Sequence, residues 1–157
     1  MFAKNKNKKK MIQRIQTLYV LISAILLGLF FSLPFADIVF GNQDYLFDIR
    51  GIVLNDKVTI SGLPIALFIA LILLIHVIVL FIYKKRILQM RMLVFSIILM
   101  LGLFGIFYFF TFYSFDDAEI HFKLCVAFPL IAIILDYLAI RAIGKDEALI
   151  RSVDRIR

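Results

Sequence analysis

Two residues that can exchange a proton, His76 and Asp136, lie inside long apolar segments of the chain. A carboxyl group near the middle of a spanning helix costs about 2.5–3.5 kcal/mol on insertion scales, so it usually faces protein or water instead of lipid. His76 lies 13 residues beyond Leu63, and Asp136 lies 13 residues beyond Lys123. Helices that enter a membrane from one face at these two positions would carry both side chains to a similar depth, because each residue advances a helix by about 1.5 Å.

Ser23 and Ser96 fall near the same level in two other apolar segments. We therefore expect a polar layer made of Asp136, His76, Ser23 and Ser96. Three interpretations stay open. The layer can fix the register of the helices through hydrogen bonds, or it can be part of a proton relay or a small translocation path. In the third, the two residues do not pair, and Asp136 reaches toward the basic residues Lys84, Lys85 and Arg86.

Other residues with catalytic or ligating chemistry are few. The chain has one cysteine and two histidines, which excludes an intramolecular disulfide and a structural zinc site of the usual Cys/His type. The acidic segment with Asp116, Asp117, Glu119 and His121 matches no specific metal-binding loop. Motifs such as HExxH, GxSxG and the P-loop are absent from the sequence. We expect no enzyme activity, no cofactor and no metal site.

The composition predicts the elements that must position the polar layer. Apolar residues make up 63% of the 157 residues, charged residues make up 18%, and the mean hydropathy is +0.99. A soluble fold of this size cannot bury so much apolar surface. Spanning helices need about 20 apolar residues each, and we predict four of them, at about 15–36, 62–83, 92–113 and 123–143. The runs do not alternate in polarity as β-barrel strands do.

The predicted fold is thus an all-α membrane protein with a single four-transmembrane-helix bundle over residues 15–143. Two alternatives carry less weight: a cleavable signal peptide in place of the first span, and a three-span protein with the Asp136 segment at the periphery. The first apolar run is longer than the 7–15 residues of a signal peptide core. Between the first two spans, β-type residues on both sides of Asn55-Asp56 predict a small extracytoplasmic β-hairpin, acting as a lid or docking a partner.

Basic residues set the expected orientation. Fifteen of the 18 lysines and arginines fall in three segments: the basic N-terminus (1–14), the loop between the second and third spans, and the region from Arg141 onward. The positive-inside rule places these segments, and both termini, in the cytoplasm. Leu149, Ile150, Val153 and Ile156 lie on one face of the tail at 144–157, which predicts an amphipathic interfacial helix. We expect anionic lipids to contact Lys84, Lys85, Arg86, Arg151 and Arg155. Nucleic-acid binding is not expected.

Several segments resemble one bacterial family. They are MIQRIQTLY at residues 11–19, FPLIA at 128–132, and LAIRAI at 138–143 running into KDEALIRSVDRIR at 145–157. These segments are similar to the domain of unknown function 4293, and the resemblance covers nearly the whole chain from Met11 onward. It implies a four-helix, multi-pass protein of the inner membrane of Gram-negative bacteria, and it implies no activity.

Three functions are compatible with these observations. The first is a non-enzymatic structural or accessory subunit of a membrane complex, with a membrane-protein partner or a second copy of the chain. The second is a small transporter or channel built around Asp136 and His76. The third, a membrane enzyme, lacks a catalytic constellation in the sequence. We expect the first of these.

Overall fold

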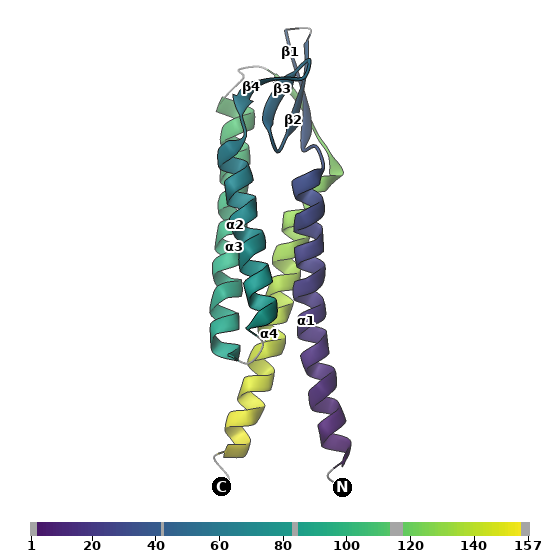
Figure 1. Cartoon of the computed structure of the whole chain (residues 1–157), viewed down its shortest axis with the longest axis vertical. Helices are drawn as coiled ribbons and strands as arrows, with labels where there is room; N and C mark the ends of the chain where they lie inside the picture. The colour runs from purple at the N-terminus through teal and green to yellow at the C-terminus, as the bar shows by residue number, and fades with distance from the viewer. Residues whose placement is uncertain (1–2, 42, 83–84, 114–117, 155–157) are drawn as a thin grey trace.

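The structure is a computed structural model that describes residues 3–41, 43–82, 85–113 and 118–154. Four long helices run side by side, and a five-stranded sheet lies across one end of them (Figure 1). The start of α1 and the end of α4 lie at the opposite end. We call these two ends the sheet end and the terminal end. The helices are α1 (Ala3–Ser32), α2 (Leu63–Phe81), α3 (Arg86–Tyr108) and α4 (Phe128–Asp154).

All four helices are long and apolar enough to cross a membrane. The segments that meet this condition are Ile15–Ser32, Leu63–Phe81, Arg86–Phe112 and Leu124–Leu149. A π-helical turn, Phe109–Tyr113, continues α3, and a 3-10 turn, Leu124–Ala127, precedes α4. Four such helices in one chain are the signature of a multi-pass membrane protein.

Helix limits differ from the expected spans at several points. α1 ends at Ser32 and not at Ala36, because Pro34 cannot continue the helix and disfavours a helical residue before it. α3 begins at Arg86, six residues before the expected start. The expected span counted only the apolar run, whereas the first turns of α3 are polar. The tail, expected as a separate helix at 144–157, instead continues α4 without a break through Gly144 to Asp154.

Each helix has one buried stripe whose residues are spaced alternately by four and three. The stripes are Gln16, Val20, Ser23, Leu27 and Phe30 in α1; Ile65, Ile69, Ile72, His76 and Val79 in α2; Gln89, Leu93, Ser96, Met100, Leu103 and Phe107 in α3; and Ala132, Asp136, Ala139, Ile143 and Asp146 in α4. This spacing is the heptad pattern of helices that pack at small crossing angles. α1 packs on α2 and α4, and α3 packs on the same two helices, so the four stripes face a common core.

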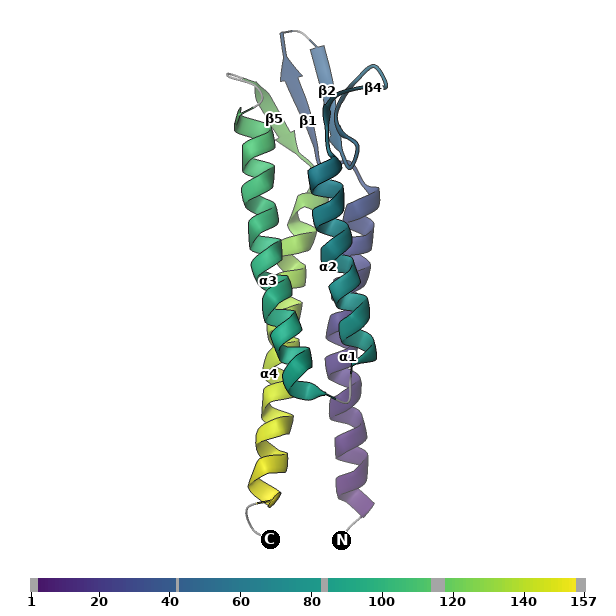
Figure 2. The ribbon, with the colours of Figure 1, turned by 60° about the vertical axis from the view of Figure 1, so that its left-hand side comes forward.

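The sheet corrects the predicted all-α fold with a single hairpin. Its strands are β1 (Ala36–Phe40), β2 (Gln43–Asp48), β3 (Gly51–Leu54), β4 (Lys57–Ser61) and β5 (Glu119–Phe122), in the antiparallel order β4-β3-β2-β1-β5. The expected turn at Asn55-Asp56 is present between β3 and β4, with positive φ at both residues. β5 comes from the connection between α3 and α4 and lies beside β1 (Figure 2).

The turn between β2 and β3 is held by one carboxylate. Asp48 Oδ1 accepts a hydrogen bond from the backbone N–H of Arg50 at 2.7 Å, and Asp48 Oδ2 accepts from Arg50 Nε at 2.9 Å and Nη2 at 2.8 Å. These side-chain hydrogen bonds and the carboxylate charge raise the pKa of Arg50. Gly51 follows with φ +115°, and a Cβ there would collide with the carbonyl oxygen of Ile60. Only glycine fits this position.

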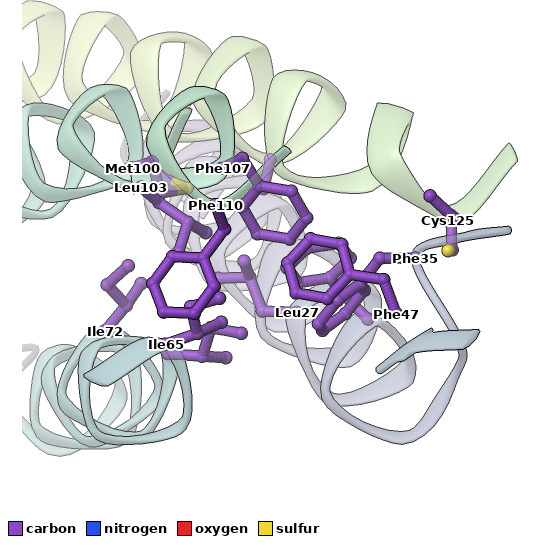
Figure 3. Close-up of a cluster of buried hydrophobic side chains, with 14 of the residues drawn as sticks. Leu27, Phe35, Phe47, Ile65, Ile72, Met100, Leu103, Phe107, Phe110 and Cys125 are labelled. Carbon is purple, nitrogen blue, oxygen red and sulfur yellow. The ribbon is translucent and has the colours of Figure 1, made fainter. Parts of the chain in front are cut away.

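Aromatic rings join the sheet to the helices. Phe35, which precedes β1, packs on Phe30 of α1, Phe47 of β2 and Phe107 of α3, with ring centroids 4.7, 5.3 and 4.9 Å apart (Figure 3). The neighbouring Pro34 carbonyl accepts a hydrogen bond from Cys125 Sγ at 2.8 Å. The sheet and the sheet ends of the helices therefore share one hydrophobic core.

Candidate functional site

His76 and Asp136 are in direct contact in the middle of the helices. His76 Nε2 lies 3.1 Å from Asp136 Oδ2 and 3.2 Å from Oδ1. Neither side chain is exposed to solvent. Both belong to the heptad stripes of their helices, α2 and α4, which point them at the common core. The structure thus brings together the two titratable residues that the sequence placed at one depth.

The other imidazole nitrogen defines the tautomer. His76 Nδ1 lies 2.9 Å from the backbone carbonyl oxygen of Ile72, one turn earlier in α2. A carbonyl oxygen only accepts hydrogen bonds, so Nδ1 carries a proton and donates it. Nε2 and the Asp136 carboxyl group form a hydrogen bond when one further proton lies on either of them. With the proton on Nε2, the pair is imidazolium and carboxylate; with it on Asp136, both groups are neutral. The net charge is zero in either arrangement, which suits a buried site.

Both serines of the predicted layer reach the imidazole ring. Ser23 Oγ lies 3.0 Å from His76 Nε2 and 3.5 Å from the carbonyl oxygen of Ala132 in α4. Ser96 Oγ lies 3.5 Å from His76 Nδ1. Both serine side chains are fully buried. Each of the four helices therefore contributes one polar side chain to a network centred on His76.

Apolar side chains enclose this network along the helix direction. Toward the sheet end lie Leu27, Ile72 and Met100. Beyond them lie Phe30, Phe35, Phe47 and Phe107, which we call the phenylalanine core. Toward the terminal end lie Val20, Val79, Leu93, Ala139 and Ile143, which form a second buried hydrophobic cluster with Ile75, the residue before His76. The polar layer is thus a single level of hydrogen bonding between two apolar levels.

A second polar level, nearer the terminal end, was missed in the sequence. Arg86 Nη1 at the start of α3 lies 3.0 Å from Asp146 Oδ2 in α4, and the Asp146 side chain is only 7% exposed. Gln89 Nε2 donates a hydrogen bond to the carbonyl oxygen of Val79 at 3.3 Å, across the connection between α2 and α3. The signal was present in the spacing, because Asp146 lies 10 residues, or three helical turns, beyond Asp136 on the same buried stripe.

The expected lipid contacts separate into three cases. Lys85 is exposed. Arg86 forms an ion pair with Asp146, and its side chain is 18% exposed. Lys84 and Arg155 lie outside the described residues, and for Arg151 only the backbone, within α4, is described.

The acidic segment gives no metal-binding arrangement in the part of the chain that the structure describes. Glu119 and His121 lie on β5, and no group of three His, Cys, Asp or Glu side chains gathers there or elsewhere among the described residues. Asp116 and Asp117 lie outside those residues.

Comparison with known proteins places the chain in a family. Residues 12–156 match the domain of unknown function 4293. The chain belongs to this family. The match covers all four helices from Ile12 onward, the sheet and the polar layer, so these features lie within the family domain. Neither the curated proteins nor the solved structures include a significant match to the chain.

Proposed function

We propose that this member of the family is a non-enzymatic structural or accessory subunit of a complex in the bacterial inner membrane. Its four helices form a transmembrane bundle, both termini lie in the cytoplasm, and the sheet lies on the periplasmic side. The observation that carries this proposal is the polar layer enclosed between two apolar levels.

The enclosed layer favours a structural role over transport. A translocation path needs polar groups or water along the length of the helices, whereas here a buried apolar cluster separates the polar layer from the level of Arg86 and Asp146. Hydrogen bonds between helices within a membrane fix their register. His76, which contacts residues of α1, α3 and α4 from its position on α2, ties all four helices together at that level.

The sheet gives such a subunit a fixed surface outside the bilayer. β1 directly follows α1, β4 leads into α2, and β5 precedes the 3-10 turn that begins α4. The phenylalanine core packs the sheet onto the helices. Because a sheet anchored at several helix ends cannot swing freely, it can present one surface to a membrane-protein partner or to a second copy of the chain.

The orientation rests on the charges at the two ends. The sheet end carries Arg50, Lys57 and Lys123 and most of the acids, whereas the other lysines and arginines belong to segments at the terminal end. Single cysteines in a Cys125→Ser background test it. We expect a membrane-impermeant maleimide to label Lys57→Cys in cells with a permeabilised outer membrane, and to label Arg91→Cys only after lysis. The reverse pattern would overturn the orientation.

The Asp136→Asn variant separates a structural role from transport. An asparagine amide can donate to Nε2 of neutral His76, so it preserves the hydrogen bond while removing the exchangeable proton. We expect normal protein level, a melting temperature close to that of the wild type, and equal proton flux in proteoliposomes of both proteins. Flux in the wild type that Asp136→Asn abolishes at equal protein level would favour the transporter and overturn the proposal.

Complex formation has its own test. Extraction of the chain at native expression level in a mild detergent, followed by native mass spectrometry, measures its assembly. We expect a stoichiometric species heavier than the 18.2 kDa chain, with either a different subunit or further copies of this one. A monodisperse monomer under these conditions would contradict the subunit role.

A further inference from the structure

An open groove lies between α1 and α4 near the terminal end. Its volume is about 370 Å³, within the range of small-molecule sites. The lining residues are Ile15 and Tyr19 from α1, and Leu138, Arg141, Ala142 and Lys145 from α4. The groove thus combines an apolar wall with two cations, and the polar layer is not part of it.

Both cations are available to a ligand. Arg141 and Lys145 are four residues apart and so lie on one face of α4, and both are exposed. Within the described part of the chain, neither side chain takes part in a hydrogen bond or an ion pair. Arg86, at the same end of the molecule, is by contrast held by Asp146.

Apolar surface continues from the groove toward the middle of the helices. Ile22 follows Tyr19 on the same face of α1, and Ile134 precedes Leu138 on the same face of α4. Ile22 is 38% exposed and Ile134 is 53% exposed. Tyr19 lies near the boundary of the span that begins at Ile15, where aromatic residues meet headgroups. The groove therefore joins two exposed cations to apolar surface that continues along both helices toward the middle of the span.

We propose that this groove binds one anionic phospholipid, with its phosphate group between Arg141 and Lys145 and an acyl chain along Ile22 and Ile134. Basic pockets between membrane helices on the cytoplasmic side recognise such headgroups. The guanidinium of Arg141 donates two parallel hydrogen bonds to phosphate oxygens, and the Lys145 ammonium adds a point charge. The site does not depend on the proposed role in a complex, and the orientation above places it in the cytoplasmic leaflet.

Native mass spectrometry of the full chain, titrated with cardiolipin and with phosphatidylcholine, tests the site. We expect the first cardiolipin to bind the wild type more tightly than phosphatidylcholine does. Arg141→Gln/Lys145→Gln should weaken cardiolipin binding about 25-fold, since each lost near-surface cation weakens binding roughly fivefold. The matched control is Lys85→Gln/Arg91→Gln, which removes the same charge from exposed cations outside the groove. An equal loss in the control would show diffuse charge attraction and overturn the site.

A charge-neutral variant checks the groove itself. Ala142→Phe fills the space between α1 and α4 without altering either cation, and we expect it to weaken the first cardiolipin while the melting temperature stays near that of the wild type. Unchanged binding in this variant would overturn the groove as the site. Inorganic phosphate should compete poorly, because it lacks an acyl chain. If it displaces the lipid readily, the groove is a site for free phosphate and the lipid proposal is wrong.

Discussion

His76 Nε2 lies 3.1 Å from Asp136 Oδ2, and both side chains are sealed from solvent between two hydrophobic clusters. The two residues come from α2 and α4, 60 positions apart in the sequence. Nδ1 of the same ring lies 2.9 Å from the Ile72 carbonyl oxygen, so Nε2 is the ring nitrogen that faces Asp136. A pair of this kind links α2 and α4 only while both partners are present, so removing either partner should lower the stability of the protein.

The loss of stability on replacing both His76 and Asp136 should be smaller than the sum of the losses on replacing each one alone. His76→Leu leaves the Asp136 carboxyl group buried without its partner, at a cost of about 1–3 kcal/mol, whereas Asp136→Leu leaves His76 Nε2 with the Ser23 hydroxyl alone and should cost less. Replacing both by leucine leaves neither partner orphaned, so the loss should be smaller than the sum of the two single losses. Equilibrium unfolding in mixed micelles measures this double-mutant cycle. Strictly additive losses would show that the two side chains are not coupled.

Ser23 should contribute less to the free energy of unfolding than Asp136 does. Ser23→Ala removes one hydroxyl from the ring contact and leaves the His76–Asp136 contact intact, so we expect a loss of about 0.6 kcal/mol, typical of hydrogen bonds between membrane helices. Ser32→Ala is the matched control on the same helix, because its exposed Oγ donates only to the Gly28 carbonyl one turn earlier. Thermal unfolding in detergent compares the two. A larger effect at Ser32 than at Ser23 would remove Ser23 from the network.

Counting along the sequence could place the polar layer because straight helices convert residue number into depth. Four residues assigned to one level by this arithmetic do meet around one imidazole ring. Depth alone does not show which of these side chains contact one another, because that depends on which face of each helix points inward. The alternation of four and three along each buried stripe carries that information, and it also places Asp146 in the core.

The sheet was only partly predictable from the sequence. The turn at Asn55-Asp56 has a local signal, so one hairpin could be expected. β1 was hidden at the end of a long apolar run, where Ala36 was counted as part of the first helix. β5 pairs with β1 across about 80 residues, as in the contact between Ile38 and Ile120. Local patterns do not specify such long-range pairing, because it depends on how the helices bring the two connections together.

Gly51 should be required for the sheet. Gly51→Ala puts a side chain at φ +115° and drives its Cβ into the carbonyl oxygen of Ile60, so we expect a marked fall in melting temperature. Gly28→Ala is the matched control, since a Cβ at this helical position meets nothing within 4 Å and alanine favours a helix by about 1 kcal/mol. We expect that variant to be as stable as the wild type or slightly more so. Equal stability of both variants would contradict the strained turn.

The ion pair between Arg86 and Asp146 should fix the terminal end of α4 against the start of α3. Asp146→Asn removes the charge that Arg86 Nη1 faces at 3.0 Å and leaves a largely buried guanidinium without its counter-ion, so we expect a loss of about 1–3 kcal/mol, the cost of a buried polar group left unpaired. Because the Arg86 side chain is 18% exposed, water softens the loss toward the lower end of that range. The exchange Arg86→Asp/Asp146→Arg restores opposite charges and should recover part of the stability, as measured by urea unfolding in micelles. If the exchange is no more stable than Arg86→Asp alone, the contact does not hold the two helices together.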